Sequence, residues 1–304
     1  MEKKENAPLK ISSISELHQI LQLPKPLHPM ISLIDNTQMV INKDMLKRNF
    51  IMEFYKISYK FSENGKMGYG QGYYDFNEGG MMFTAPNQIL STDEEAYYHG
   101  YTLLIHPDFL RNYPLAKTIK KFGFFSYDTN EALHLSDKEK TIVVGLLNNI
   151  LGELNTAIDE MSQDVIVSYV EVLLNYSNRF YKRQFITRKS FSNDLLTKME
   201  DLLDNYFNQQ DTLTKGLPTV EFLASELNLS PHYLSDMLRN LTGQNAQQHI
   251  HEKLIEKAKE YLTTTNFSVA EVAYQLGFEH SQSFNKLFKK KTDTTPLIYR
   301  QSFN

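Results

Sequence analysis

The sequence predicts an α+β fold in which an antiparallel β-barrel and a helical pair precede an all-α domain. Three observations predict it. Short segments of alternating polarity run from about residue 26 to residue 106, two long amphipathic segments follow residue 136, and a pair of short helices joined by a turn occurs twice after residue 194. We expect domains at 1–183 and 194–304, joined by a polar, basic linker at 184–193.

Within the first domain, residues 51–61 alternate as the two faces of one strand would. One face carries Glu53, Tyr55 and Tyr59, and the opposite face carries Lys56, Ser58 and Lys60. Because alternate strand residues line the inside of a barrel, we expect the first face to line an effector pocket. The lining has one carboxylate and no clustered arginine, which favours a small uncharged or cationic organic molecule. An orientation of the carboxylate toward solvent stays equally open.

The two helices that follow are expected at 137–160 and 162–180, where apolar residues recur at helical spacing. Ser136 and Glu139 form the sequence pattern of a capping box at the start of the first helix. The pair is expected either to form a homodimer interface or simply to pack on the barrel. The sequence does not decide between these roles.

The last pair of short helices lies within residues 268–300. Apolar residues run at helical spacing from Val269 to Leu276, Gly277 interrupts them, and Phe284 and Phe288 resume the pattern. The polar side chains of the second helix then point outward: Ser281, Gln282, Asn285, Lys286, Lys289 and Lys290. Short polar groups and amides followed by lysines suit base edges and then phosphates, so this helix is expected to contact DNA. A structural helical hairpin with a solvated lysine face is the alternative.

A second copy of this unit lies about 50 residues upstream, at 220–241, with Asn228 in place of the turn glycine. Ser230 followed by Pro231 predicts the start of its second helix. The outward residues of that helix are His232, Ser235, Asp236 and Arg239. An amphipathic segment at 244–263 connects the two units, and a helix of about 20 residues spans roughly 30 Å. Two DNA-contacting helices could thus be held near one helical repeat of DNA, about 34 Å.

The C-terminal third, about 195–300, resembles the AraC/XylS family of transcription regulators through VAYQLGF, SFNKLFKKKTDTTPLIYR and LSPHYLSDML. The resemblance implies a DNA-binding domain whose two helix-turn-helix units enter adjacent major grooves of a double-stranded operator. It departs from the family at two positions. Asp293 stands where the family usually has glycine, and Asp236 stands where a basic or amide side chain is common.

Gly80, followed six residues later by Pro86, resembles a motif of cupin barrels, which this family often places before its DNA-binding domain. The His-x-His pair of metal-binding cupins is absent, and Ser91 stands where the later histidine would fall. We therefore expect a barrel without metal, cofactor or catalytic activity.

Composition excludes several classes of function. The chain has 304 residues, enough for about two domains, and no cysteine, which rules out disulfides, thiol chemistry and the methyl-accepting cysteines of alkylation-repair relatives. Residues 194–304 hold 11 Lys and Arg against 14 Asp and Glu, so DNA binding must depend on local charge, and we expect Arg300 to cluster with the lysines of 286–291. No apolar run could span a bilayer and the start is not a secretory signal, which favours a cytoplasmic protein without membrane contact.

The sequence therefore predicts a homodimeric, non-enzymatic transcription regulator controlled by a small organic effector, with RNA polymerase left open as a further partner. Two alternatives stay open. The N-terminal domain could only dimerise, or it could be a barrel enzyme fused to a DNA-binding domain.

Overall fold

The structure is a computed structural model that describes residues 8–40, 49–61, 67–69, 72–74, 80–91, 99–128, 131–156, 159–187 and 189–303. The chain divides into two compact units, Met1–Gln184 and Phe185–Asn304. None of the described helices is both long enough and apolar enough to cross a membrane.

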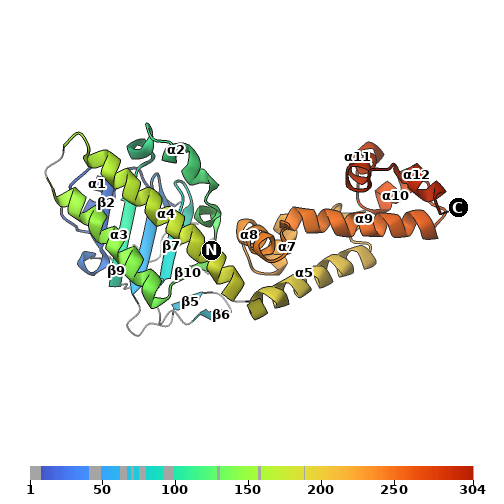
Figure 1. Cartoon of the computed structure of the whole chain (residues 1–304), viewed down its shortest axis with the longest axis horizontal. Helices are drawn as coiled ribbons and strands as arrows, with labels where there is room; N and C mark the ends of the chain where they lie inside the picture. Colours follow the sequence, from blue (N-terminus) through green and yellow to red (C-terminus); the bar gives the residue numbers. More distant parts are fainter. Residues whose placement is uncertain are drawn as a thin grey trace, which may run out of the picture. The chain divides into compact units, whose positions relative to one another are not determined.

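An antiparallel five-stranded sheet forms the centre of the first unit. Its strands, in spatial order, are β10 (Leu133–His134), β7 (Gly80–Thr84), β4 (Tyr55–Phe61), β9 (His99–Ile105) and β2 (Ile31–Asp35). Two long helices, α3 (Asp137–Asn155) and α4 (Ser162–Thr187), lie across one face of this sheet (Figure 1). Met81 of β7 is fully buried on that face, with its sulfur 3.9 Å from the Ser177 hydroxyl of α4.

A smaller sheet lies over the other face. It consists of β1 (Leu9–Ile11), β3 (Asn49–Met52) and β8 (Ile89–Ser91), with α1 (Ile14–Ile20) beside it. An apolar cluster fills one end of the space between the sheets, where Ile34 and Leu104 of the large sheet meet Phe50 and Met52. The hairpin β5 (Met67–Tyr69) and β6 (Gly72–Tyr74) pairs only with itself among the described strands. These strands form two facing sheets, and no closed barrel is seen among them.

The expected continuous alternation over residues 51–61 is wrong, because the chain leaves one sheet and enters the other within it. β3 ends at Met52, residues 53 and 54 form a bend, and β4 begins at Tyr55. The bend is held by the Glu53 amide, which donates to the Ile11 carbonyl at 3.1 Å, and Phe54 is fully buried in it. Glu53 therefore does not share a strand face with the residues of β4.

The two predicted long helices are confirmed. The capping box at Ser136 and Glu139 is present, with the Ser136 amide donating to the Glu139 carboxylate at 2.8 Å. α4 runs further than expected, to Thr187, and α5 begins at Lys189, so the segment predicted as a linker is helical on both sides of residue 188. The buried Gln184 amide accepts from the His134 backbone at 2.8 Å and donates to the Ala132 carbonyl at 3.2 Å, which gives this polar residue a structural role.

Short helical turns connect β9 to β10, and alternation patterns gave no indication of them. They are η2 (Pro107–Leu110), α2 (Leu115–Thr118), η3 (Ile119–Lys121) and η4 (Gly123–Ser126); a further turn, η1 (Asn36–Gln38), follows β2. Phe124 and Phe125 of η4 pack on Phe83 with ring centroids 4.3 and 5.7 Å away, so these turns bury aromatic rings at the sheet edge.

The second unit is helical throughout its described regular structure. Its helices are α5 (Lys189–Asn208), α6 (Thr212–Lys215), α7 (Val220–Glu226), α8 (Pro231–Thr242), α9 (Ala246–Thr264), α10 (Val269–Gln275), α11 (Ser281–Thr292) and α12 (Pro296–Gln301). The core around α10 and α11 includes Val272, Ala273, Phe284 and Phe288, all fully buried. These are the apolar positions that the spacing predicted.

Candidate nucleic-acid interface

Two turns of the same construction join α7 to α8 and α10 to α11. Asn228 has a φ of 56° and Gly277 a φ of 89°, as their residue types predicted. The residue after each closes the turn in the same way: the Leu229 amide donates to Ala224 at 2.9 Å, and the Phe278 amide donates to Ala273 at 3.0 Å. The two helix-turn-helix units thus fix the start of their second helix with the same turn geometry.

Gly277 also permits a close contact between backbones. A Cβ atom on Gly277 would lie 2.7 Å from the carbonyl carbon of Gly216 and 3.0 Å from the Leu217 nitrogen. The segment after α6 is fixed there by two further bonds, from Thr212 Oγ1 to the Gln275 carbonyl at 2.7 Å and from the Tyr206 hydroxyl to the Gly216 carbonyl at 3.1 Å. The second helix-turn-helix unit is therefore held against α5 and α6 by close contact between backbone atoms.

The similarity extends past the second helix of each unit. Gly243 caps the end of α8 and Asp293 caps the end of α11, and both residues have the left-handed backbone conformation, with φ of 81° and 57°. The side chain of the preceding threonine donates back into its helix in each case, from Thr242 to Leu238 at 2.9 Å and from Thr292 to Phe288 at 2.8 Å. Asp293 takes the conformation that the family's glycine would, at the steric cost of a Cβ.

α11 presents the most exposed polar surface among the predicted DNA contacts. Ser281 is half-buried, and the other five predicted residues of this helix are exposed: Gln282, Asn285, Lys286, Lys289 and Lys290. Together with Lys291, its lysines form no ion pair with any residue that the structure describes. Burial, followed by the charges of Lys291 and Lys290, lowers the pKa of His251 in α9. The positive field of α11 therefore reaches its neighbouring helix.

α8 differs from α11 in its charge. His232 and Arg239 are exposed, whereas Ser235 and Asp236 are half-buried. Arg239 Nη1 donates to Asp236 Oδ1 at 2.6 Å, and 53% of the Arg239 side chain is exposed. The Asp236 carboxylate, which departs from the family pattern, thus orients Arg239 and offsets its charge.

α9 is the predicted connector between the units. The apolar residues that recur along it at four-residue steps are fully buried: Ile250, Leu254, Ala258 and Leu262. Lys253 pairs with Asp204 of α5 at 2.6 Å, and Lys257 donates to Asn208 at 3.1 Å, so the connector is fastened to α5. Arg300 was expected in the lysine cluster of α11. It donates from Nε to the Leu262 carbonyl at 3.0 Å instead, where it caps the end of α9.

The C-terminal unit is similar to known proteins. A family model described as a helix-turn-helix domain matches residues 223–302, a range that holds most of α7 and all of α8 to α12. The C-terminal unit contains a helix-turn-helix domain of the AraC type. The bifunctional transcriptional activator and DNA repair enzyme AdaA of Bacillus subtilis is 32% identical over 101 residues, which are 33% of this chain and 46% of AdaA.

Another relative is similar over more of the chain. YfiF of Bacillus subtilis, an HTH-type transcriptional regulator, is 21% identical over 254 residues, 82% of this chain and 77% of YfiF. By contrast, the chain matches only 28% of the regulatory protein PocR of Salmonella typhimurium. The C-terminal domain of the response regulator yesN from Fusobacterium nucleatum, a solved structure, is 35% identical and covers 33% of this chain and 96% of its own, with a TM-score of 0.29. The chain thus spans less than half the length of PocR and of AdaA.

In the N-terminal unit, the three residues expected to line an effector pocket are not brought together on one strand face. Glu53 lies in the bend and pairs with Lys10 of β1, Oε1 to Nζ 2.6 Å, and this hydrogen bond lowers the pKa of Glu53. Tyr55 and Tyr59 are buried on β4, where their rings pack on Phe125 and Phe61 with centroids 5.0 and 4.9 Å apart.

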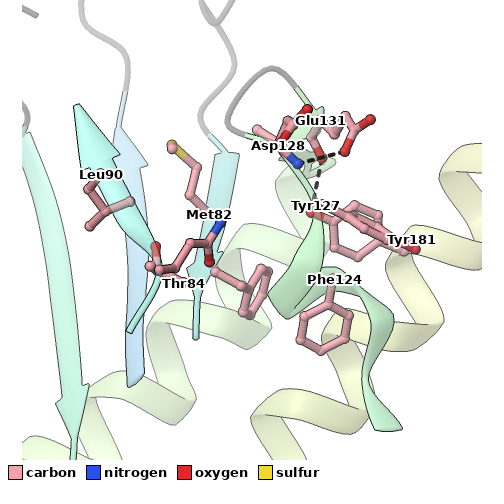
Figure 2. Close-up of a pocket in the computed structure, with 11 residues that line it drawn as sticks. Met82, Thr84, Leu90, Phe124, Tyr127, Asp128, Glu131 and Tyr181 are labelled. Atoms are coloured by element: carbon pink, nitrogen blue, oxygen red, sulfur yellow. Dashed lines mark hydrogen bonds between the residues drawn. The ribbon is translucent and has the colours of Figure 1, made fainter. Parts of the chain in front are cut away.

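A small pocket lies nearby at the edge of the large sheet (Figure 2). Met82, Thr84 and Leu90 form one side of it, and Phe124 and Tyr181 form the other. These two rings stack on each other with centroids 5.6 Å apart, and the Tyr181 hydroxyl donates to the Glu131 carbonyl at 3.1 Å. The cavity volume is about 10 Å³, room for about one water molecule. This pocket is too small for an organic effector.

Proposed function

We propose that this protein is a sequence-specific transcription regulator that places α8 and α11 in adjacent major grooves of operator DNA. The observation that carries the proposal is the duplicated helix-turn-helix unit, in which α11 bears four exposed lysines that form no ion pair with a described residue. A connector of 19 residues in α9 spans about 28 Å at 1.5 Å per residue, close to the helical repeat of B-DNA.

The contacts divide by chemistry. Gln282 and Asn285 carry amides that can pair with base edges, and Lys286, Lys289 and Lys290 supply phosphate contacts. On α8, His232 and Ser235 are the candidates for base contacts, with Arg239 held by Asp236. Because the Arg239 charge of α8 is paired with Asp236 and the lysines of α11 pair with no described residue, α11 supplies most of the electrostatic affinity.

Selection of bound sequences from random DNA tests this proposal with the full chain. Gln282→Ala and Asn285→Ala should each relax base preference in one half of the selected site, at about 1 to 3 kcal/mol. Lys286→Ala should weaken binding to all sequences and reduce the slope of log K against log salt by about one. Lys198→Ala, an exposed lysine of α5, is the matched control and should leave the slope unchanged. Selection that enriches no sequence would refute the proposal.

We propose further that the protein is a homodimer through α3 and α4. Val172 of α4 is 40% exposed, and a Cβ atom on Gly145 or Gly152 of α3 would meet nothing within 4 Å, so the outer surface of the pair offers an apolar residue and open backbone. Sedimentation at micromolar concentration should give about 70 kDa, twice the chain mass of 35.4 kDa. Val172→Glu should give the monomer, because it places a charge in the interface. A monomeric wild type, with and without DNA, would contradict this.

Control by a small-molecule effector bound in the N-terminal unit is the last part of the proposal. The alternative, an N-terminal unit that only dimerises, predicts that no small molecule changes DNA affinity. A barrel enzyme fused to a DNA-binding domain is the less favoured reading, since the matched relatives are regulators, although AdaA is also a repair enzyme. Transcription in vitro with RNA polymerase and the selected operator would determine whether the protein activates or represses.

A further inference from the structure

The contact between α9 and α11 is apolar, and polar residues lie at its edge. Leu254 of α9 belongs to the same buried cluster as Phe288 of α11. His251 lies one helical turn before Leu254 on the same side of α9, and on α11 one turn separates Phe288 from Lys291. The charges of Lys291 and of its neighbour Lys290 act on His251, which is half-buried. A histidine of the connector thus lies close to the basic end of α11.

The basic end of α11 continues the lysine surface that is proposed to contact phosphate. Lys290 lies one helical turn after Lys286, and both side chains are exposed. Because residues four apart lie on one side of a helix, these two side chains follow one line along α11. Lys290 is also one of the two lysines whose charge reaches His251. A DNA backbone that contacts both lysines would therefore continue toward His251 of the connector.

His251 is held as the neutral imidazole in the protein without DNA. Its Nε2 atom lies 3.0 Å from the side-chain nitrogen of Gln247, one turn earlier in α9. An amide nitrogen only donates hydrogen bonds, so Nε2 accepts and the ring proton is on Nδ1. Burial and the nearby lysine charges lower the pKa of His251 and so favour the same neutral form. Gln247 is exposed, which leaves its amide free to turn away when the ring gains a second proton.

A phosphate beside His251 would reverse this preference. The charges that act on the ring are those of Lys291 and Lys290, and both are positive. Glu252, the next residue of α9, instead accepts a hydrogen bond from the Gln244 side chain at 2.5 Å. A phosphate oxygen would offset the lysine charges and accept a charge-assisted hydrogen bond, and each effect favours the imidazolium form.

We propose that His251 makes a DNA contact of its own, in which the protonated ring donates from Nε2 to a backbone phosphate between the two major grooves. The inference rests on the proposed DNA binding by α8 and α11. It makes operator affinity depend on pH, because the pKa of His251 is then higher in the complex than in the free protein and binding takes up a proton. Affinity should be highest in acid and should fall as pH rises from the free pKa to the bound one.

Operator affinity of the full chain, measured from about pH 5.5 to pH 8 at constant ionic strength, tests the proposal. His251→Gln should remove a loss of up to about tenfold in affinity per pH unit, the effect of one proton. His249→Gln is the matched control on the same helix, because His249 is half-buried and bonds to Thr242 at 2.9 Å, and it should keep the wild-type profile. At the acidic end, the slope of log K against log salt should be steeper by about one in wild type than in His251→Gln, which a purely structural histidine would not cause. Identical pH profiles of wild type and His251→Gln overturn the proposal.

Gln247→Ala is a second variant, at an exposed position that the fold does not depend on. It removes the hydrogen bond that holds the neutral ring, so the free protein should protonate more readily and the loss of affinity should begin at a higher pH. An onset at the wild-type pH would also overturn the proposal. The same samples separate the two levels of inference: DNA binding without a proton uptake that depends on His251 refutes only this contact, whereas failure to select any DNA sequence refutes the regulator itself.

Discussion

Gly277→Ala offers the sharpest test of how the second helix-turn-helix unit is held. The added Cβ would lie 2.7 Å from the carbonyl carbon of Gly216 and 2.9 Å from its oxygen, distances that real Cβ atoms do not adopt. The atoms it meets are backbone, so no side chain can rotate away. Gly243→Ala is the matched control, because its φ of 81° imposes a similar left-handed strain while nothing lies within 4 Å of its Cβ.

The difference in unfolding free energy between the two variants measures the cost of the steric clash. The left-handed conformation costs alanine about 1 to 2 kcal/mol in each. Displacing the Gly216 segment should add about 1 to 3 kcal/mol to Gly277→Ala, the usual cost of overpacking. The measurement is hydrogen exchange of the α9 and α10 amides at increasing denaturant concentration, which reports the free energy of unfolding of this unit. A Gly277→Ala cost equal to or below that of Gly243→Ala would refute the reasoning.

Three further predictions concern other parts of the chain. Asp293→Gly should stabilise the C-terminal unit by about 0.5 kcal/mol in the same exchange measurement, because glycine accepts the φ of 57° that strains aspartate; a loss of stability would contradict this. Burial lowers the pKa of Lys60 to about 7 in the folded chain, from 10.5 when unfolded, so the unfolded chain binds more protons between these values and stability should rise with pH there. Wild type should gain at most a few kcal/mol over this pH range relative to Lys60→Met, and a pH-independent difference between the two would disprove it. Glu53→Gln should leave any effector-induced rise in melting temperature unchanged, since Glu53 pairs with Lys10 outside β4, and a lost response would place Glu53 in the binding site.

The C-terminal unit was predictable because short-range signals specify it. Glycine or asparagine at the turns, Ser230 before Pro231 and apolar residues at helical spacing are each local, and the structure confirms them. Repetition of the unit then made each copy evidence for the other. The position of Arg300 was missed because its partner is a helix end 38 residues away in the chain.

The N-terminal unit was less predictable because its faces are assigned by tertiary contacts. Alternation separated Tyr55 and Tyr59 from Lys56 and Lys60 correctly, but it could not tell which set meets helices and which meets the second sheet. Nor could it reveal the bend at Glu53, since a change of sheet leaves the pattern of polarity almost intact. The pocket was therefore expected on the tyrosine face, whereas the structure buries both Tyr55 and Tyr59 in the core.

The unequal charge of α8 and α11 has a directional consequence. Of the two helices proposed to contact DNA, α11 carries Lys286, Lys289, Lys290 and Lys291, whereas α8 carries the Arg239–Asp236 pair. A single chain bound to DNA as proposed would therefore have a strongly anchored end at α11 and a weakly anchored end at α8. As salt rises, α8 should be the first to release, which would leave a singly attached state from which the chain can rebind or dissociate.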